Sequence, residues 1–143
     1  MLSSRFALGV ARIEWVRPER RRVNVMLQSG NVTLMVTDLD RSVRFYTGTL
    51  GFRMHYQADG HWAEVGIKDL TIGLHPAKDP TERPARGEDL SLGLQVESLE
   101  SAMDALRAKG VRFERGPVDD QAVRLAFFSG PDGYPLYLCE VKR

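Results

Sequence analysis

The sequence predicts an α+β fold of two βαβββ modules that form a curved mixed sheet around a cavity, with the helices outside. Two observations lead to this prediction: residues 32–52 and 92–111 repeat one pattern, and a charged segment separates the two copies. A repeat of this kind means that the chain builds one structural unit twice. One unit alone could bury only one face of its sheet, so we expect the two units to pack side by side.

Each copy begins with a strand. Apolar residues alternate with other residues over this stretch, which is the period of a strand with one buried face. The alternating apolar positions are Val32, Leu34 and Val36 in the first copy and Leu92, Leu94 and Val96 in the second. A slip of one residue would turn every side chain to the opposite face. Because the apolar positions need the face that the helix covers, their neighbours are expected to face the cavity.

Each first strand leads into a helix, in which apolar residues recur at three- and four-residue intervals on one face. Asp38 or Asp40 is expected to cap the first helix and Ser98 the second, since these side chains accept hydrogen bonds from free backbone amides. Gly51 and Gly110 are expected to end the two helices, because glycine adopts the left-handed conformation cheaply.

Three further strands follow each helix. They are expected at about 52–57, 61–67 and 70–76 in the first copy, and at about 111–117, 121–129 and 134–141 in the second. The sequence Gly-Pro-Asp-Gly at 130–133 supplies the residue types that a tight connection needs.

The segment between the copies is typical of an exposed linker. Residues 78–89 hold prolines, a glycine and seven charges, without an apolar period. We therefore expect a single domain over 28–143, with modules at about 28–77 and 90–143. Residues 1–27 are expected to be an N-terminal extension that is poorly ordered and not catalytic.

Three interpretations of this arginine-rich extension stay open. A segment rich in arginine and serine is typical of a mitochondrial presequence, although Glu14 and Glu19 make the match partial. The extension could instead be an arm that packs on a partner subunit. It could also lie upstream of a functional start at Met26, which is the interpretation we favour.

The composition excludes several classes of partner. With 20 basic and 19 acidic residues, the chain has no charge excess that would favour nucleic acid or a membrane surface. No apolar run approaches the length needed to cross a bilayer. The single cysteine, Cys139, cannot form an intramolecular disulfide, which fits a cytoplasmic location. It is expected to be an unreactive buried thiol.

Two stretches resemble the vicinal oxygen chelate superfamily. The first begins at Asn31 and reads Asn-Val-Thr-Leu-Met-Val-Thr-Asp-Leu-Asp-Arg-Ser-Val-Arg-Phe-Tyr, with Leu-Gly-Phe at 50–52. The second reads Gly-Pro-Asp-Gly-Tyr at 130–134, with the strand after it. The superfamily includes glyoxalase I, extradiol dioxygenases, fosfomycin-resistance enzymes and bleomycin-resistance proteins. The resemblance covers about residues 30–141 and implies the two-module fold, but it implies little about the substrate, since one fold carries many functions.

The resemblance also implies where a metal would bind. Enzymes of the superfamily hold one divalent ion with His, Glu or Gln side chains from the first and last strand of each module. Those positions fall on Asn31, Gly73, Ser91 and Tyr137. None is His, Glu or Asp, Gly73 has no side chain, and Tyr137 would need an unusually low pKa to bind a metal. We therefore expect no metal and no other cofactor.

The same strands indicate the residues of a ligand site. The candidates share the predicted cavity face or a former metal position: Asn31, Thr33, Met35, Trp62, Glu64, Gly73, His75, Ser91, Phe127 and Tyr137. The aromatic side chains among them could line an apolar pocket or could simply be packed core.

Two of these candidates carry groups that could act chemically. His75 could be a ligand contact, an acid–base group or a displaced metal ligand, or a solvated histidine at a strand end. Glu64, in register with Trp62, could receive a cationic or hydrogen-bonding ligand, or could lie on a solvated face. No catalytic residue is assigned from the sequence.

Three functions therefore stay open. The leading hypothesis is metal-independent binding of a small organic molecule, similar to the drug-sequestering proteins of the superfamily. The second is a lyase, isomerase or dioxygenase of glyoxalase type, with a non-standard metal site built from His75 and Glu64. The third is a non-catalytic regulatory module. A homodimer is expected, because members of the superfamily often pair.

Overall fold

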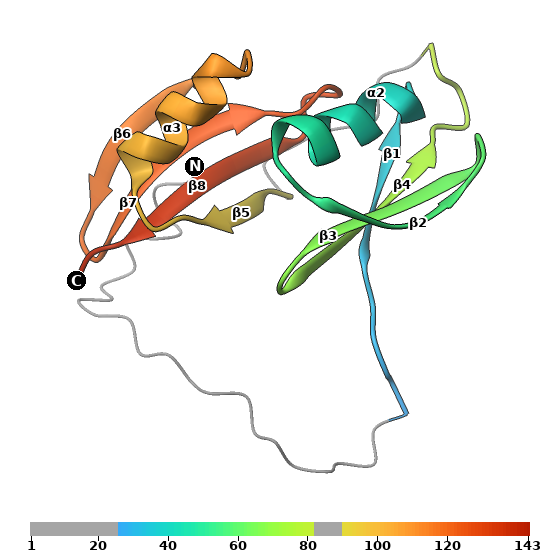
Figure 1. The fold of residues 1–143 in the computed structure, drawn as a ribbon, viewed down its shortest axis with the longest axis horizontal. Coiled ribbons are helices and arrows are strands. Elements are labelled where there is room, and N and C mark those ends of the chain that lie inside the picture. Colours follow the sequence, from blue (N-terminus) through green and yellow to red (C-terminus); the bar gives the residue numbers. More distant parts are fainter. Residues whose placement is uncertain (1–25, 82–89) are drawn as a thin grey trace.

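The computed structural model describes residues 26–81 and 90–143. Residues 1–25 of the predicted N-terminal extension and residues 82–89 of the predicted linker lie outside the described residues. Each of the two described segments forms one module, and Figure 1 shows the modules side by side. None of the helices in the described segments has the length and apolarity that a membrane span requires.

Both modules have the predicted βαβββ order. The first contains β1 (Val32–Val36), α2 (Leu39–Val43), the π-helix η1 (Arg44–Thr49), β2 (Arg53–Ala58), β3 (Trp62–Ile67) and β4 (Leu70–Pro76). The second contains β5 (Leu92–Gln95), α3 (Leu99–Ala108), β6 (Arg115–Asp120), β7 (Val123–Ser129) and β8 (Pro135–Val141). The predicted α+β class and two-module architecture are confirmed.

The strands form two four-stranded sheets, one in each module. Sheet A has the order β1-β4-β3-β2 and sheet B the order β5-β8-β7-β6. The first and last strands of each module pair in parallel, and the other neighbours are antiparallel. Val32 pairs with Ile72 and Thr33 with Gly73, so the residues that the apolar alternation assigns to one face lie opposite each other on that face.

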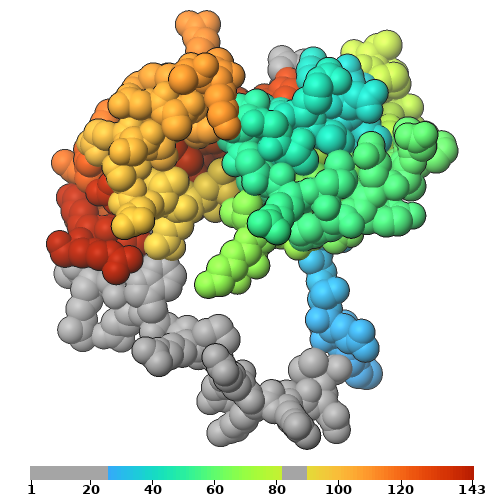
Figure 2. All heavy atoms as spheres, viewed as in Figure 1, coloured from blue at the N-terminus to red at the C-terminus, as the bar shows by residue number. Residues whose placement is uncertain are grey.

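One core runs through both modules on the helix side of the sheets. Figure 1 shows α3 lying across sheet B, and α2 contacts β3 and β4 of sheet A. Leu34, Ile72 and Leu74 of the first module belong to the same buried cluster as Leu99 and Leu136 of the second. In Figure 2 the teal and green atoms of the first module lie against the yellow and orange atoms of the second.

The predicted helix ends are confirmed. The Asp38 side chain caps α2 by accepting a hydrogen bond from the amide of Arg41. The Ser98 side chain caps α3 by accepting a hydrogen bond from the amide of Ser101. Gly51 and Gly110 follow the helices with φ of 82° and 95°, in the left-handed region that favours glycine.

Two elements differ from the sequence prediction. The first helix continues as a π-helix, in which the amide of Leu50 donates to the carbonyl of Phe45. The wider turn buries Tyr46 and leaves Leu50 only partly buried. Strand β6 begins at Arg115 and not near 111, because Phe113 packs its ring edge against Phe128 in the core, with ring centres 5.4 Å apart.

Two residues of the turn before β8, Asp132 and Tyr134, make polar contacts with the first module. Asp132 is 2% exposed and accepts hydrogen bonds from the amide of Thr37 at 3.3 Å and from its hydroxyl at 2.6 Å. Arg41 Nη2 lies 3.5 Å from the same carboxylate. The Tyr134 hydroxyl donates to the carbonyl of Met35 at 2.8 Å. The end of β1 is therefore fixed to the second module.

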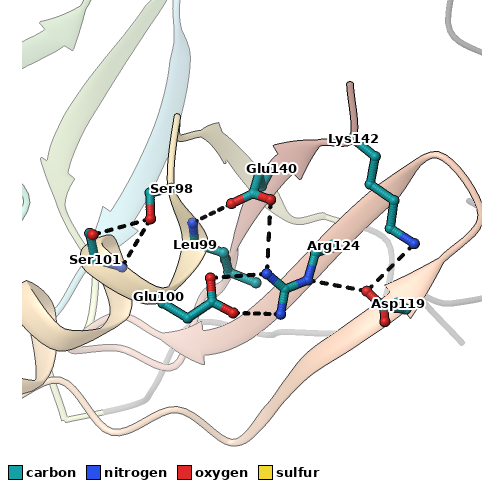
Figure 3. A network of polar contacts seen from close by, with 8 residues as sticks. All are labelled: Ser98, Leu99, Glu100, Ser101, Asp119, Arg124, Glu140 and Lys142. Atoms are coloured by element: carbon teal, nitrogen blue, oxygen red, sulfur yellow. Dashed lines mark hydrogen bonds and ion pairs between the residues drawn. The ribbon is translucent and has the colours of Figure 1, made fainter.

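A second polar network fastens α3 to sheet B (Figure 3). Arg124 of β7 forms a bidentate ion pair with Glu100 of α3, with nitrogen–oxygen distances of 2.6 and 2.9 Å. Its Nε lies 3.1 Å from Asp119. Glu140 of β8 accepts a hydrogen bond from the amide of Leu99 at 2.7 Å, and so satisfies a free amide at the start of α3.

Candidate functional site

Sheet A has one face that the helices do not cover, and we call it open face A. Strand pairing places Thr33, Gly73 and Glu64 in one row across this face. The next row begins with Met35 opposite His75. The ring of Trp62 lies over Gly73 and meets the His75 ring edgewise, with the ring centres 6.3 Å apart. Six of the sequence-derived candidates are thus brought onto one surface.

Trp62 fills the space above Gly73 on open face A. A β-carbon added to Gly73 would overlap the Trp62 ring and would approach the Thr33 hydroxyl to 2.9 Å. Only glycine at position 73 leaves enough space for the indole ring above it. The sequence shows the glycine and the tryptophan, but not that one covers the other.

The polar candidates on open face A do not form a pair. His75 is exposed, and its Nδ1 lies 2.7 Å from the carbonyl of Pro76. Glu64 is half-buried on β3, opposite Gly73 and Tyr56. Within the described segments no hydrogen bond or ion pair joins His75 to Glu64.

Sheet B has the corresponding surface, open face B, and it is mainly aromatic and apolar. Tyr137 pairs with Phe127 across the strands, with ring centres 6.0 Å apart. The guanidinium of Arg115 lies 5.3 Å from the centre of the Phe127 ring, within the range of a cation–π contact. Val123 and Leu125 are buried beside them. Sequence reasoning missed Arg115, because an irregular register between Arg115 and Val118 hides which face Arg115 occupies.

The Tyr137 ring lies over Gly93, much as Trp62 lies over Gly73. A β-carbon at position 93 would overlap the phenol of Tyr137. Burial, and to a lesser degree the neighbouring Cys139, raises the pKa of Tyr137 above its ordinary value. The phenol therefore carries its proton at neutral pH. Burial also raises the pKa of the Cys139 thiol, so Cys139 is not an activated nucleophile.

The two other positions at which the superfamily resemblance locates a metal ligand lie just before the first strand of each module. Asn31 is exposed, and its side-chain oxygen accepts a hydrogen bond from the Thr33 hydroxyl at 2.8 Å. Ser91 is half-buried before β5. Both offer only neutral oxygen atoms.

This donor set does not fit a divalent metal. Stable sites use imidazole, carboxylate or thiolate groups, usually three or more of them. Here the four positions offer an amide, no side chain, a hydroxyl and a protonated phenol. Over residues 26–81 and 90–143, no three His, Cys, Asp or Glu side chains lie close enough together to hold an ion. What the two open faces do offer is aromatic and apolar surface with a few charged or polar side chains, among them Glu64, His75 and Arg115.

Both open faces end at an unpaired strand edge. Among the described residues, β1 pairs only with β4 and β5 only with β8, so the outer edges of β1 and β5 have no strand beside them. Large apolar side chains are exposed on β1 and β2: Val32 is 39% exposed, Met35 44% and Tyr56 59%. A monomer of a globular protein usually protects such edges.

Comparison with known proteins gives a family-level match. The family model described as the Glyoxalase/Bleomycin resistance protein/Dioxygenase superfamily matches residues 28–138. A lactoylglutathione lyase of Haemophilus influenzae is 29% identical, with 81% of this chain and 94% of the relative covered. A probable lactoylglutathione lyase of Vibrio parahaemolyticus is 30% identical over 77% of this chain and 88% of the relative. The chain spans only 38% of a probable chloroplastic lactoylglutathione lyase of Arabidopsis thaliana.

Solved structures give the same result for the fold. The crystal structure of SMU.1112c is 30% identical with a TM-score of 0.67, covering 81% of this chain and all of that one. The antibiotic-binding protein TnmS3 from Streptomyces sp. CB03234 is 24% identical with a TM-score of 0.66, covering 83% of this chain and all of that one. At 24% identity the likeness to TnmS3 shows the fold alone.

Proposed function

Because the chain belongs to the glyoxalase/bleomycin resistance protein/dioxygenase superfamily, we propose that it binds a small organic molecule on its open faces without using a metal ion. The observation that carries the proposal is that aromatic rings lie at the two last-strand positions where the superfamily resemblance locates a metal ligand, one in each module. One is covered by the indole of Trp62, and the other is itself the ring of Tyr137. Aromatic rings supply rigid contact area for ligands that stack, and they supply little to a metal.

The polar groups around these rings support binding of a planar ligand with polar ends. Arg115 lies over Phe127 on open face B, and Glu64 lies on open face A in the row of Gly73. Such isolated charges beside an apolar surface orient a ligand that hydrogen-bonds at its rim. The likeness in fold to an antibiotic-binding protein agrees with this proposal.

Binding can be followed through Trp62. The chain contains two tryptophans, so a Trp15→Phe variant leaves Trp62 as the single indole reporter. In this variant, a planar aromatic ligand from a small-molecule library is expected to quench the fluorescence saturably and to raise the melting temperature. Tyr137→Ala should weaken the same ligand at least tenfold, whereas Asp104→Ala on α3, at a side chain that is 79% exposed and lies on the helix side of the sheets, serves as control. A library without a single saturable ligand would contradict the proposal.

We also propose that the chain forms a homodimer in which the partner covers an open face. Among the described residues the outer edges of β1 and β5 are unpaired, and Val32 and Met35 of β1 are exposed; both observations support this proposal. Sedimentation should give twice the chain mass. A Val32→Lys substitution at the edge of sheet A should shift the equilibrium toward monomer, whereas Lys78→Gln should not. A wild-type protein that sediments as a monomer at high concentration would contradict the homodimer.

A glyoxalase-type enzyme remains the second candidate, because several relatives are named lactoylglutathione lyases. This function would use a non-standard metal site with His75 and Glu64. A lactoylglutathione lyase assay with added divalent ions tests it. Activity that disappears in both His75→Ala and Glu64→Gln would support the enzyme, and no activity with any ion would exclude it.

A non-catalytic regulatory module is the third candidate, and the absence of any stabilising ligand would favour it. We further propose a cytoplasmic location, which the single cysteine supports. The domain limits 28–143 and the extension 1–27 likewise stay proposals. Intact-mass analysis of the native protein would show whether the chain starts at Met1 or at Met26.

A further inference from the structure

A groove on the helix side of the molecule lies between the two modules. Its volume is about 330 Å³. The first module contributes Leu50, Phe52 and Ile67, and the second contributes apolar side chains from β5, β8 and one face of α3. None of the ten candidate residues of the open faces lines this groove. It is therefore a separate site, built where the modules meet.

The wall of the groove is apolar and open to solvent. Ile67 is 40% exposed, Leu50 and Leu106 are partly exposed, and Ala105 of α3 is exposed. These side chains would gain about 25 cal/mol for each Å² of apolar surface that a ligand covered. In Figure 2 this region lies at the seam where the yellow atoms of the second module approach the teal and green atoms of the first.

Among the described residues, the lining of the groove contains one charged side chain, and that side chain is basic. Lys109, the residue that follows α3, lines the rim, and its Nζ lies 3.5 Å from the carbonyl of Gly48. The other polar lining residues are Thr49 and Gln95, both neutral. Among the described residues no carboxylate belongs to the lining, so the groove is complementary to an apolar molecule that carries one negative charge.

We propose that this groove binds a small amphipathic carboxylate, with its hydrocarbon chain between the modules and its carboxylate beside Lys109. The volume is at the lower end of the roughly 300–1,000 Å³ that ligand sites usually have, so a short chain fits and a helix of a partner protein does not. Each buried methylene adds about 0.8 kcal/mol, which makes the affinity depend on chain length.

Octanoate, octanol and octylammonium, used below the concentrations at which they aggregate, test the proposal by calorimetry and thermal shift. They share one apolar chain and differ in the charge of the head. Octanoate is expected to bind most tightly, octanol about threefold more weakly and octylammonium most weakly. Lys109→Gln should weaken octanoate about threefold and leave octanol unchanged, because a solvent-exposed ion pair contributes at most about 1 kcal/mol. Lys78→Gln is the control.

A second pair of variants tests the location. Ala105→Trp places a large ring in the groove and should abolish octanoate binding, whereas Ala108→Trp on the same helix lies outside the groove and should not. Absence of saturable octanoate binding, or equal binding of octylammonium, would overturn the proposal. So would an Ala105→Trp variant that changed the sedimentation coefficient and left octanoate binding intact, since the groove would then be a subunit interface.

Discussion

The indole of Trp62 lies directly across Gly73, in the space that a side chain at position 73 would need. Position 73 is one of the four places where the superfamily resemblance locates a metal ligand. A metal-binding side chain there would have to displace the indole first. At this position the structure therefore has an aromatic surface in the space that a metal-binding side chain would need.

The Trp62–Gly73 contact predicts a strongly coupled pair of substitutions. Gly73→Ala should reduce the free energy of unfolding by about 1–3 kcal/mol, because the added methyl group overlaps the indole. In a Trp62→Leu background the same substitution should cost much less. Urea denaturation of the four proteins gives the coupling energy. Gly48→Ala is the matched control, since nothing lies within 4 Å of its added β-carbon. Equal costs in both backgrounds would show that the two residues do not compete for space.

Tyr46 predicts a loss of stability at alkaline pH. Its hydroxyl is buried and has no hydrogen-bond partner among the described residues. Burial raises the pKa of Tyr46 well above its usual value of about 10, and Tyr134 and Asp132 add to the shift. Between the unfolded and the folded pKa only the folded state keeps the proton, so the free energy of unfolding falls as pH rises above about 10.

Tyr46→Phe should remove this alkaline decline and should stabilise the protein at neutral pH by about 1 kcal/mol, because a buried, unbonded hydroxyl is lost. Thermal unfolding at pH 7 and at pH 10.5 measures both effects. Tyr56→Phe, at an exposed tyrosine, should change neither. A destabilised Tyr46→Phe variant would mean that the hydroxyl has a partner.

Replacing Asp132, a single turn residue that joins the two modules, is predicted to lower the stability of the protein strongly. Its buried carboxylate accepts hydrogen bonds from the amide and hydroxyl of Thr37 and lies near Arg41. Asp132→Ala should therefore reduce the free energy of unfolding by about 2–4 kcal/mol, since hydrogen bonds to a charged group are worth roughly 1.5–3 kcal/mol and the Thr37 amide would be left unpaired. Asp59→Ala, at an exposed loop position, should have little effect. A cost below about 0.5 kcal/mol for Asp132→Ala would contradict the role of this contact.

The Arg124 network predicts acid-sensitive docking of α3. The hydrogen bond from Arg124 lowers the pKa of Glu100 below its usual value. The resulting stabilisation is present above that usual value and is lost as pH falls through the lower, folded pKa. Arg124→Met should therefore lower the melting temperature at pH 7, with a difference from wild type that shrinks at pH 3 and in high salt. Arg112→Met is the control, and a difference independent of pH would contradict the network.

Much of the fold was predictable because local rules and the repeat agree with each other. Apolar alternation at Val32, Leu34 and Val36 predicts both the strand and the face that the helix covers, and Leu34 and Val36 are buried in the core as expected. Ser98 and Gly110 mark the ends of α3 through their backbone chemistry, without any long-range contact.

Features that depend on distant packing were not predictable in the same way. In the sequence Asp132 has only the features of a turn residue. Its hydrogen-bond partner, Thr37, is 95 positions away in the chain, so the contact could not be predicted. The overlap of Trp62 with Gly73 depends on a side-chain rotamer, and the place of Arg115 beside Phe127 depends on an irregular strand register. The groove at Lys109 exists only because of how the two modules pack.

The metal content of the native protein tests the central claim most directly. Protein purified without chelators and analysed by inductively coupled plasma mass spectrometry is expected to contain far less than one divalent ion per chain. Added Zn²⁺, Ni²⁺ or Mn²⁺ should not raise its melting temperature, because a metal that bound the folded state would stabilise it. One tightly bound divalent ion per chain, lost together with a drop in melting temperature on addition of a chelator, would contradict metal-independent binding.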